Sequence, residues 1–150
     1  MKAEEYFGNW QNPEAMVSYE PMPNPESPEN ASVDFVNKTG AVQSVINITY
    51  PLDLKPGSDD AIKAGVMNAI LGGGVFSSKL MQNLREDKAY TYGARSTLDI
   101  DPYQGYFNAY ASVRNEVTDS SVVEFLNEME AMRSQKVSDE NLNIAKKFMT

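Results

Sequence analysis

The stretch that decides the fold runs from residue 68 to residue 92 and reads NAILGGGVFSSKLMQNLREDKAYTY. Its three consecutive glycines interrupt an amphipathic pattern, because glycine destabilises a helix interior and permits a tight turn. The spacing of apolar residues predicts one helix from Ser58, as N-cap, to about Leu71, and a second helix over about 77–87. A strand of alternating side chains follows from Tyr90.

Further elements flank this pair of helices on both sides. Alternation predicts a short strand at Val33–Phe35 and a second over 42–50 that Pro51 ends. The strands at 90–98 and 105–113 are joined by a turn at 99–102, which predicts an antiparallel hairpin. Two more helices follow, over about 118–134 and from Ser138 onward. The order ββααββαα predicts an α+β fold, an antiparallel sheet with helices packed on one face.

The N-terminal region has a different composition. Residues 1–11 carry Tyr6, Phe7 and Trp10 and read as the tail of a preceding domain. Residues 12–30 contain five prolines and no basic residue, which predicts an extended linker. Residues 31–150 are expected to form the main domain. We expect this domain to continue beyond Thr150, because the last helix keeps its amphipathic spacing to the end without a Gly or Pro signal.

Composition excludes several classes of function. The 150 residues carry a formal net charge of −8, which argues against nucleic acid and anionic membranes as partners. The chain has neither Cys nor His, so disulfides, thiolate chemistry, Ser-His-Asp triads and His-ligated metals are excluded. We therefore expect the chain by itself not to be an enzyme. No apolar run approaches the ~18–20 residues of a membrane span, and residues 1–6 have no signal-peptide hydrophobic region. We therefore expect a soluble protein and any targeting signal to lie outside these residues; the bacterial cytoplasm and the periplasm both stay open as the compartment.

The triple glycine does not have the context of a phosphate loop. Such a loop follows a strand and carries Gly-Lys-Ser/Thr before its helix, whereas these glycines follow a helix and Lys79 comes after Ser77 and Ser78. A tight helix-to-helix turn is the structural alternative.

Arg85 and Tyr92 are the chemically interesting pair. A guanidinium donates to carbonyl or carboxylate oxygens in a fixed fork, and a phenol can donate to a developing oxyanion. The chemistry of the residues alone favours a simpler interpretation, in which Arg85 compensates a helix dipole and Tyr92 is strand packing. The acidic cluster Glu124, Glu128 and Glu130 is interpreted as a solvated helix face, beside Arg133.

The decisive stretch resembles a motif of the M16 (pitrilysin/insulinase-like) zinc peptidases. That motif is Asn-x-x-Leu-Gly-Gly-Gly-x-x-Ser-Ser-Arg-Leu, then Leu-Arg-Glu-x-x-Gly-x-x-Tyr, and every gap matches, including the seven-residue step from Arg85 to Tyr92. Weaker agreement is found at Tyr6-Phe7-Gly8-x-Trp10, at Gln43-Ser44 and at Ala145-Lys146. The resemblance covers nearly the whole chain.

The resemblance implies a two-half enzyme enclosing a chamber. One half carries His-x-x-Glu-His, which binds zinc and supplies the general base; the other contributes an Arg–Tyr pair to an unstructured peptide substrate. Because this chain has no His, it resembles the second, non-zinc half. The resemblance thus implies no cofactor in this chain, zinc in a partner half on the same polypeptide or a paired subunit, and a place in a zinc-dependent endopeptidase.

The resemblance also implies roles for individual residues. Arg85 is expected to bind backbone carbonyls of the substrate, and Tyr92 to stabilise the tetrahedral intermediate at the zinc of the partner half. Gly72, Gly73 and Gly74 are expected to shape the loop that faces that half and to contribute to substrate binding.

Two positions depart from the family pattern. Lys79 stands where Arg is usual, and Ala89 stands where Gly is usual. If that Gly needs positive φ, Ala89 requires a different local backbone, and Tyr92 is then slightly displaced. Two alternatives stay open: an M16-like scaffold domain that has lost zinc chemistry, and an unrelated α+β binding domain.

Overall fold

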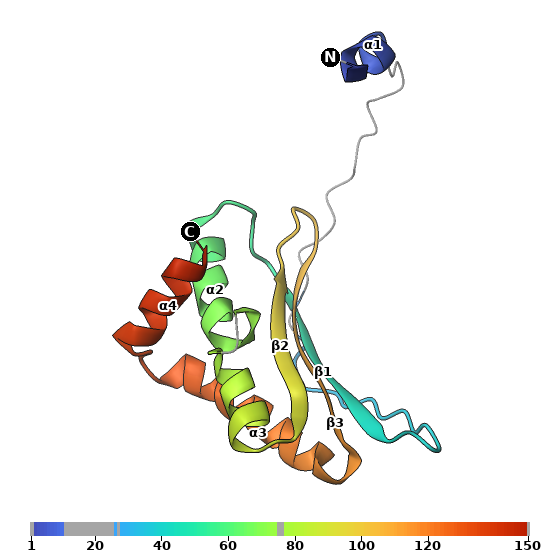
Figure 1. Cartoon of the computed structure of the whole chain (residues 1–150), viewed down its shortest axis with the longest axis vertical. Helices are drawn as coiled ribbons and strands as arrows, with labels where there is room; N and C mark the ends of the chain where they lie inside the picture. The colour runs from blue at the N-terminus through green and yellow to red at the C-terminus, as the bar shows by residue number, and fades with distance from the viewer. Residues whose placement is uncertain (1, 11–25, 27, 75–76, 150) are drawn as a thin grey trace.

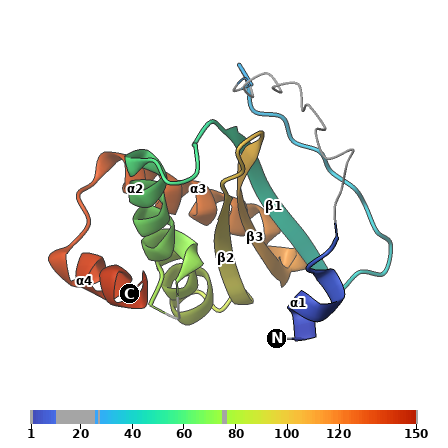
Figure 2. The same cartoon turned by 90° about the horizontal axis from the view of Figure 1, so that it is seen from above.

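A computed structural model describes residues 2–10, 26, 28–74 and 77–149. Its body has two layers, a sheet and a set of helices packed on one face of it (Figure 1). The view from above separates α2 and α4 on one side from the strands on the other (Figure 2). The predicted fold class, an antiparallel sheet with helices on one face, is confirmed.

The sheet has three strands in the order β1-β3-β2, with β1 at Gln43–Leu52, β2 at Thr91–Asp99 and β3 at Gly105–Arg114. Both pairings are antiparallel, and β2 and β3 form the predicted hairpin. The backbone N–H groups of Tyr103 and Gln104 donate to Asp101 Oδ1 and stabilise the turn between β2 and β3. Strands β1 and β2 are both sheet edges.

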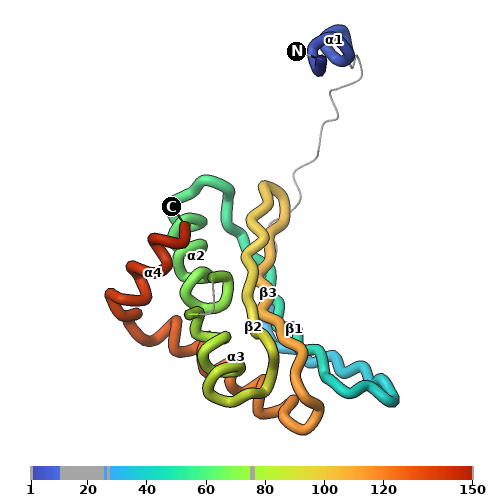
Figure 3. Tube along the Cα trace, viewed as in Figure 1, coloured from blue at the N-terminus to red at the C-terminus, as the bar shows by residue number. Residues whose placement is uncertain are grey.

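The helices follow the predicted spacing. Helix α2 spans Asp59–Asn68, and the Ser58 side chain accepts from the Ala61 N–H as its N-cap. The chain continues in π-helical turns at η1 (Ala69–Gly73) and η2 (Met81–Asp87). A 3₁₀ turn, η3 (Asn115–Val117), then leads into α3 (Thr118–Ser134) and α4 (Asp139–Met149). The tube trace in Figure 3 shows how η1 and η2 connect α2 to β2.

The core lies between the sheet and the helices. Phe107 and Val113 from β3 pack with Phe125 from α3 and with Leu80 and Leu84 from the helical segment before β2, and all five are fully buried. Alternate residues of β3 are buried, which is the pattern of a strand with one covered face. Among the residues that the structure describes, no helix packs on the opposite face of the sheet (Figure 2).

Two expectations about the N-terminal strands were wrong. Val33–Phe35 forms no strand, and Val33 and Phe35 are 91% and 82% exposed. A strand is stable only when it pairs with a neighbouring strand, and this exposed segment has none. Pro51 does not end the second strand, since β1 continues to Leu52. Pro51 is tolerated there because β1 is an edge strand, where the missing N–H costs no ladder hydrogen bond.

Helix α1 (Lys2–Phe7) precedes the body and has no buried residue. The predicted linker at 12–30 falls almost entirely outside the described residues. Among the helices that the structure describes, none is long and apolar enough to cross a membrane.

Candidate functional site

Gly72 lies where the helical layer comes close to the backbone of β2. It is buried in η1, and a Cβ built on it would stand 2.6 Å from the Ser96 amide nitrogen and 2.7 Å from Leu80 Cδ1. Real Cβ atoms do not approach backbone so closely, so only glycine fits this position. The predicted tight turn is therefore required by packing against β2.

Asn68 joins the same turn to the sheet through hydrogen bonds. Ser96 Oγ donates to Asn68 Oδ1 at 2.6 Å, and Asn68 Nδ2 donates to the Ser96 carbonyl at 3.3 Å. Ser96 is 1% exposed, so its hydroxyl needs a protein partner. Sequence reasoning noted Asn68 only as the first residue of the motif; its role depends on a residue 28 positions away.

Arg85 lies in η2, just before the chain turns into β2. Its side chain is 37% exposed, and its Nε lies 3.4 Å from Glu86 Oε1. The Arg85 carbonyl accepts from the Ala89 N–H at 3.1 Å, and the Leu84 carbonyl accepts from the Tyr90 N–H at 2.9 Å. These bonds terminate η2 and fix the start of β2 relative to Arg85.

Ala89 adopts the left-handed backbone that glycine would supply. Its φ is +52°, and among the described residues it is the one non-glycine residue with positive φ. The expectation that Ala89 would require a different local backbone is thus wrong. The chain keeps the left-handed turn because the hydrogen bonds around it outweigh a cost of about 1–2 kcal/mol for an L-residue.

A β-bulge directs Tyr92 to the solvent. Thr91 pairs with Val113 and Ala94 with Ala111, so three steps along β2 match two along β3. In a regular strand Tyr92 and Ala94, two residues apart, would point to the same, covered face of the sheet. Because of the extra residue in the bulge, Tyr92 instead points outward and is 89% exposed.

The side chain of Thr91 stabilises the bulge. Its hydroxyl donates to the Ser112 carbonyl at 2.6 Å and accepts from the Gly93 N–H at 3.1 Å. Bulges often re-aim a side chain next to a functional site. Alternation alone gave no sign of this irregularity, since residues 90–98 were expected to alternate throughout.

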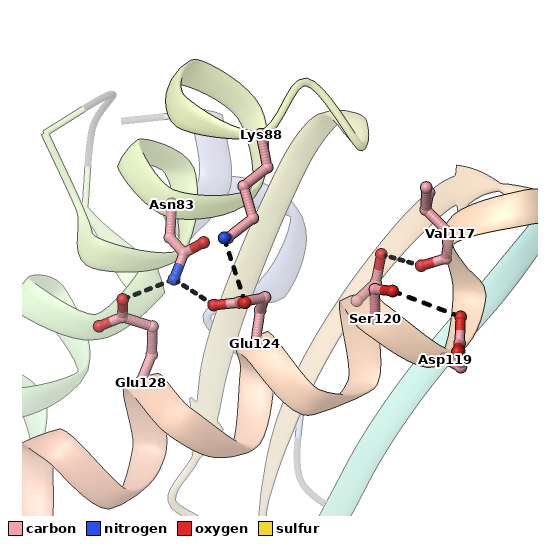
Figure 4. Close-up of polar contacts among 8 residues, drawn as sticks. Asn83, Lys88, Val117, Asp119, Ser120, Glu124 and Glu128 are labelled. Atoms are coloured by element: carbon pink, nitrogen blue, oxygen red, sulfur yellow. Dashed lines mark hydrogen bonds and ion pairs between the residues drawn. The ribbon is translucent and has the colours of Figure 1, made fainter.

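A polar cluster connects η2 to α3 (Figure 4). Asn83 Nδ2 donates to Glu124 Oε2 at 3.0 Å and to Glu128 Oε1 at 2.8 Å. Lys88 Nζ lies 3.2 Å from Glu124 Oε1, and Lys79 Nζ lies 3.9 Å from Glu128 Oε2. We call these five residues the α3 clamp. Lys79 and Asn83 precede Arg85 in the chain and Lys88 follows it, so the segment that carries Arg85 is held to α3 on both sides.

The α3 clamp corrects the interpretation of the acidic cluster. Glu124 and Glu128 have side chains only 21% and 18% exposed, so they are not a solvated face. The hydrogen bond from Asn83, with the nearby Lys88 charge, lowers the pKa of Glu124 against the opposing effect of burial. Only Glu130 fits the earlier interpretation, since it is 62% exposed beside Arg133.

The donor set of this chain does not fit zinc. The sequence has no His or Cys, and no group of three metal-ligating side chains occurs in the part of the chain that the structure describes. Glu124 and Glu128 are already occupied by amide and ammonium donors. A crevice beside the glycine turn, between η1 and α4, has room for about one water and offers no ligand pocket.

The site residues therefore occupy two places. Gly72 lies against the middle of β2 at Ser96, while Arg85 and Tyr92 lie on either side of the turn that enters β2. Four residues of strand separate Tyr92 from Ser96, which is about 13 Å along β2. Gly73 is exposed and Gly74 is half-buried.

Comparison with known proteins identifies the family. The profile described as "Peptidase M16 inactive domain" matches residues 1–149. No curated protein matches the chain.

Solved structures share the fold. A peptidase M16 inactive domain from Pseudomonas fluorescens superposes with a TM-score of 0.68 at 22% identity, covering 73% of this chain and 26% of that one. A conserved protein from Enterococcus faecalis V583 gives 0.65 at 26% identity, with 73% and 25% covered. The periplasmic protease PqqL from Escherichia coli gives 0.60 at 15% identity, with 73% and 12% covered. The chain thus spans about a quarter or less of the length of these proteins.

Proposed function

This chain belongs to the family of M16 peptidase inactive domains, and from that premise we propose that it is the substrate-binding, non-zinc half of an M16-type metallopeptidase. In this proposal it pairs with a half that carries His-x-x-Glu-His, on the same polypeptide or a second subunit. The substrate is an unstructured peptide. The chain contributes Arg85 and Tyr92 and no metal ligand.

The observation that carries the proposal is the exposure of Tyr92. A phenol that is 89% exposed on an ordered strand contributes little to packing, and the Thr91 bulge is what turns it outward. A phenol held on a strand can donate to an oxyanion that develops on a peptide carbonyl, because its direction is set before the substrate arrives. Tyr92 is the proposed oxyanion donor.

Arg85 is the proposed anchor for the peptide backbone. Its guanidinium is partly exposed, always charged and carries five donors in a planar fork. The backbone bonds that end η2 and the α3 clamp restrict the segment from which it projects. A restricted donor loses less entropy on binding, which favours a role in positioning the scissile bond.

The glycine turn is proposed to face the partner half. Gly73 is exposed next to the buried Gly72, so the turn is both rigidly packed and accessible. Zinc, held in the partner half, would supply the polarisation of the scissile carbonyl. This chain would supply binding, orientation and one hydrogen-bond donor.

The division of the chain is part of the proposal. Residues 1–11 are proposed as the tail of a preceding domain, 12–30 as a linker and 31–150 as the inactive domain. The division is supported by α1, which has no buried residue, and by β1, which begins the sheet only at Gln43.

A peptidase assay tests the proposed function. We would follow a quenched fluorescent peptide with the protein that contains this chain and its His-x-x-Glu-His half. Tyr92→Phe is expected to lower kcat about 10²-fold, as the loss of an oxyanion donor does. Arg85→Ala is expected to raise KM, because it removes binding to the substrate backbone.

Two matched variants serve as controls. Tyr103→Phe removes a hydroxyl from another exposed tyrosine, and Arg133→Ala removes a guanidinium that is 81% exposed. Both should leave kcat and KM unchanged. Cleavage that is indifferent to Arg85→Ala and Tyr92→Phe, or no zinc-dependent cleavage at all, would instead identify the chain as an M16-like scaffold domain.

A further inference from the structure

One face of the sheet has no helix packed on it among the described residues, and we call it the open face (Figure 2). The exposed positions of β2 on this face after its bulge are Arg95, Thr97 and Asp99. On β3, Tyr106 and Tyr110 share the same side and are 47% and 37% exposed. The open face therefore offers charged, hydroxyl and aromatic groups to a ligand.

The bulge in β2 connects Tyr92 to the open face. It places Tyr92 opposite Ser112, an exposed residue on the open side of β3. Arg95 lies three residues further along β2, which is about 10 Å, and Asp99 lies four residues beyond Arg95, which is about 13 Å. A peptide whose scissile carbonyl contacts Tyr92 therefore meets these two charges if it continues along β2.

The outer backbone of β2 is less suited to hold such a peptide. Strand β2 has no neighbouring strand on its outer side, but the Ala94 N–H donates to Met81 Sδ at 3.4 Å. The Ser96 carbonyl accepts from Asn68 Nδ2 at 3.3 Å. An added strand would displace these contacts with the helical layer, so the side chains of the open face are the more favourable partners.

Arg95 is distinguished by its lack of an ion pair among the described residues. The other arginines of the chain each lie beside a carboxylate: Arg85, Arg114 and Arg133. In a chain of net charge −8, an exposed guanidinium without a carboxylate partner attracts an acidic ligand. Its planar fork binds a carboxylate through two parallel hydrogen bonds.

Asp99 supplies the opposite charge at the far end of β2. It likewise has no ion pair in the part of the chain that the structure describes. Its partner across the ladder is Tyr106, which lines a hollow of about 390 Å³ together with Pro51 and Gln104. A lysine or arginine packs its aliphatic stem along such a surface and keeps its charge near a ring and a carboxylate. This end of the open face therefore favours a basic side chain.

We propose that the open face is a subsite that selects peptides carrying an acidic and a basic residue four positions apart. The acidic side chain binds Arg95 and the basic side chain binds at Asp99. The inference rests on the function proposed above, in which Tyr92 contacts the scissile carbonyl. The acidic residue is then the one nearer to the scissile bond, about three residues from it.

The spacing follows from the geometry of extended chains. Residues i and i+4 of an extended peptide point to the same side and lie about 13 Å apart, which is the separation of Arg95 and Asp99 along β2. A peptide with the two charges on adjacent residues points them to opposite sides and satisfies only one of the two pairs.

Fluorescence anisotropy tests the subsite without any cleavage. We would use the protein that contains this chain and its His-x-x-Glu-His half, freed of zinc, with labelled peptides of one unstructured sequence. The peptide with Glu and Lys four positions apart should bind about tenfold more tightly than the peptide with Gln at both positions, because each exposed ion pair contributes up to about fivefold. The peptide with adjacent Glu and Lys has the same net charge and should bind about threefold more weakly than the first.

Two variants assign the preference to residues. Arg95→Gln and Asp99→Asn should each reduce the tenfold preference to about threefold and leave the affinity for the Gln peptide unchanged. Arg133→Gln and Glu130→Gln are the matched controls, since both residues are exposed on α3, and they should keep the full preference. Equal affinity for all three peptides, no binding, or a preference that survives both Arg95→Gln and Asp99→Asn would overturn the subsite.

Tyr92→Phe separates this inference from the function on which it rests. In the zinc-loaded protein it should lower kcat, and in the binding experiment it should keep the charge preference. A preference assigned to Arg95 and Asp99, with kcat indifferent to Tyr92→Phe, would support the subsite and remove the oxyanion role of Tyr92. A loss of kcat in Tyr92→Phe without any charge preference would support the proposed function and overturn the subsite.

Discussion

Ala89 and Gly72 show how single residues set the site at the residue scale. Ala89 accepts a left-handed φ of +52° so that η2 can end directly before β2. Gly72 has no side chain, so η1 can touch the backbone of Ser96. Each residue positions a segment of the candidate site, Ala89 through its left-handed backbone and Gly72 through the absence of a side chain.

Ala89→Gly is expected to raise the free energy of unfolding by about 1 kcal/mol, because glycine adopts positive φ without the Cβ clash. Urea denaturation measures the change. Ala131→Gly is the control: Ala131 lies within α3, where the same substitution should destabilise by about 1 kcal/mol. If both variants lose stability equally, the left-handed turn at Ala89 is not strained.

At the element scale, the start of β2 is defined by interactions that cross from one element to another. The Thr91 hydroxyl joins β2 to β3 at Ser112, and the α3 clamp joins η2 to α3. The same short segment, residues 79–92, thus receives polar contacts from both layers of the body. These contacts position Arg85 and Tyr92 relative to the rest of the domain.

Thr91→Val is expected to destabilise the domain by about 1 kcal/mol, because it keeps the shape of the side chain and removes its hydroxyl from the bulge. It should also make Tyr92 less exposed, which chemical iodination followed by mass spectrometry measures. Thr91→Ser retains the hydroxyl and should preserve both properties. Unchanged Tyr92 reactivity in Thr91→Val would show that the bulge does not depend on this hydroxyl.

The α3 clamp predicts an acid-dependent stability. Because the pKa of Glu124 is lowered in the fold, its contribution is complete above the ordinary value of 4.5. The contribution is lost as the pH falls through the lowered folded pKa. Thermal unfolding between about pH 3 and 7 should therefore give a flatter profile for Glu124→Gln than for wild type. Glu130→Gln, on the exposed side of α3, should keep the wild-type slope, and a wild-type slope in Glu124→Gln would contradict a role for the clamp.

At the scale of the whole molecule, the described residues form a compact body of sheet and helices, preceded by helix α1, which buries none of its residues. The helices cover one face of a three-stranded sheet whose two outer strands have free edges. The solved relatives are about four or more times longer than the matched region, so the body is one unit of a larger arrangement in those proteins.

The proposed division predicts the result of limited proteolysis. Proteinase K, which has little sequence preference, should cut first between residues 12 and 30, where five prolines disfavour regular structure. The stable product should retain the sheet and helices of residues 43–149. First cuts within that body, detected by intact mass, would contradict the proposed boundaries.

Local patterns determined much of this protein without any tertiary information. The Ser58 and Ser138 caps, the α3 span and the β2–β3 hairpin depend on residues close in sequence, so periodicity and turn chemistry predicted them. The motif of residues 68–92 likewise identified the family before the fold was known, because its gaps are fixed within one continuous stretch.

Tertiary structure decided the features that depend on distant partners. Val33–Phe35 has a strand pattern but no strand, because pairing requires a neighbour that local pattern cannot supply. The outward direction of Tyr92 depends on the register between β2 and β3, and the α3 clamp joins residues 41 and 45 positions apart. The sequence by itself therefore determined the helices, the hairpin and the family, but not every strand. Packing decided where the side chains of the candidate site point, because direction depends on contacts between segments far apart in the chain.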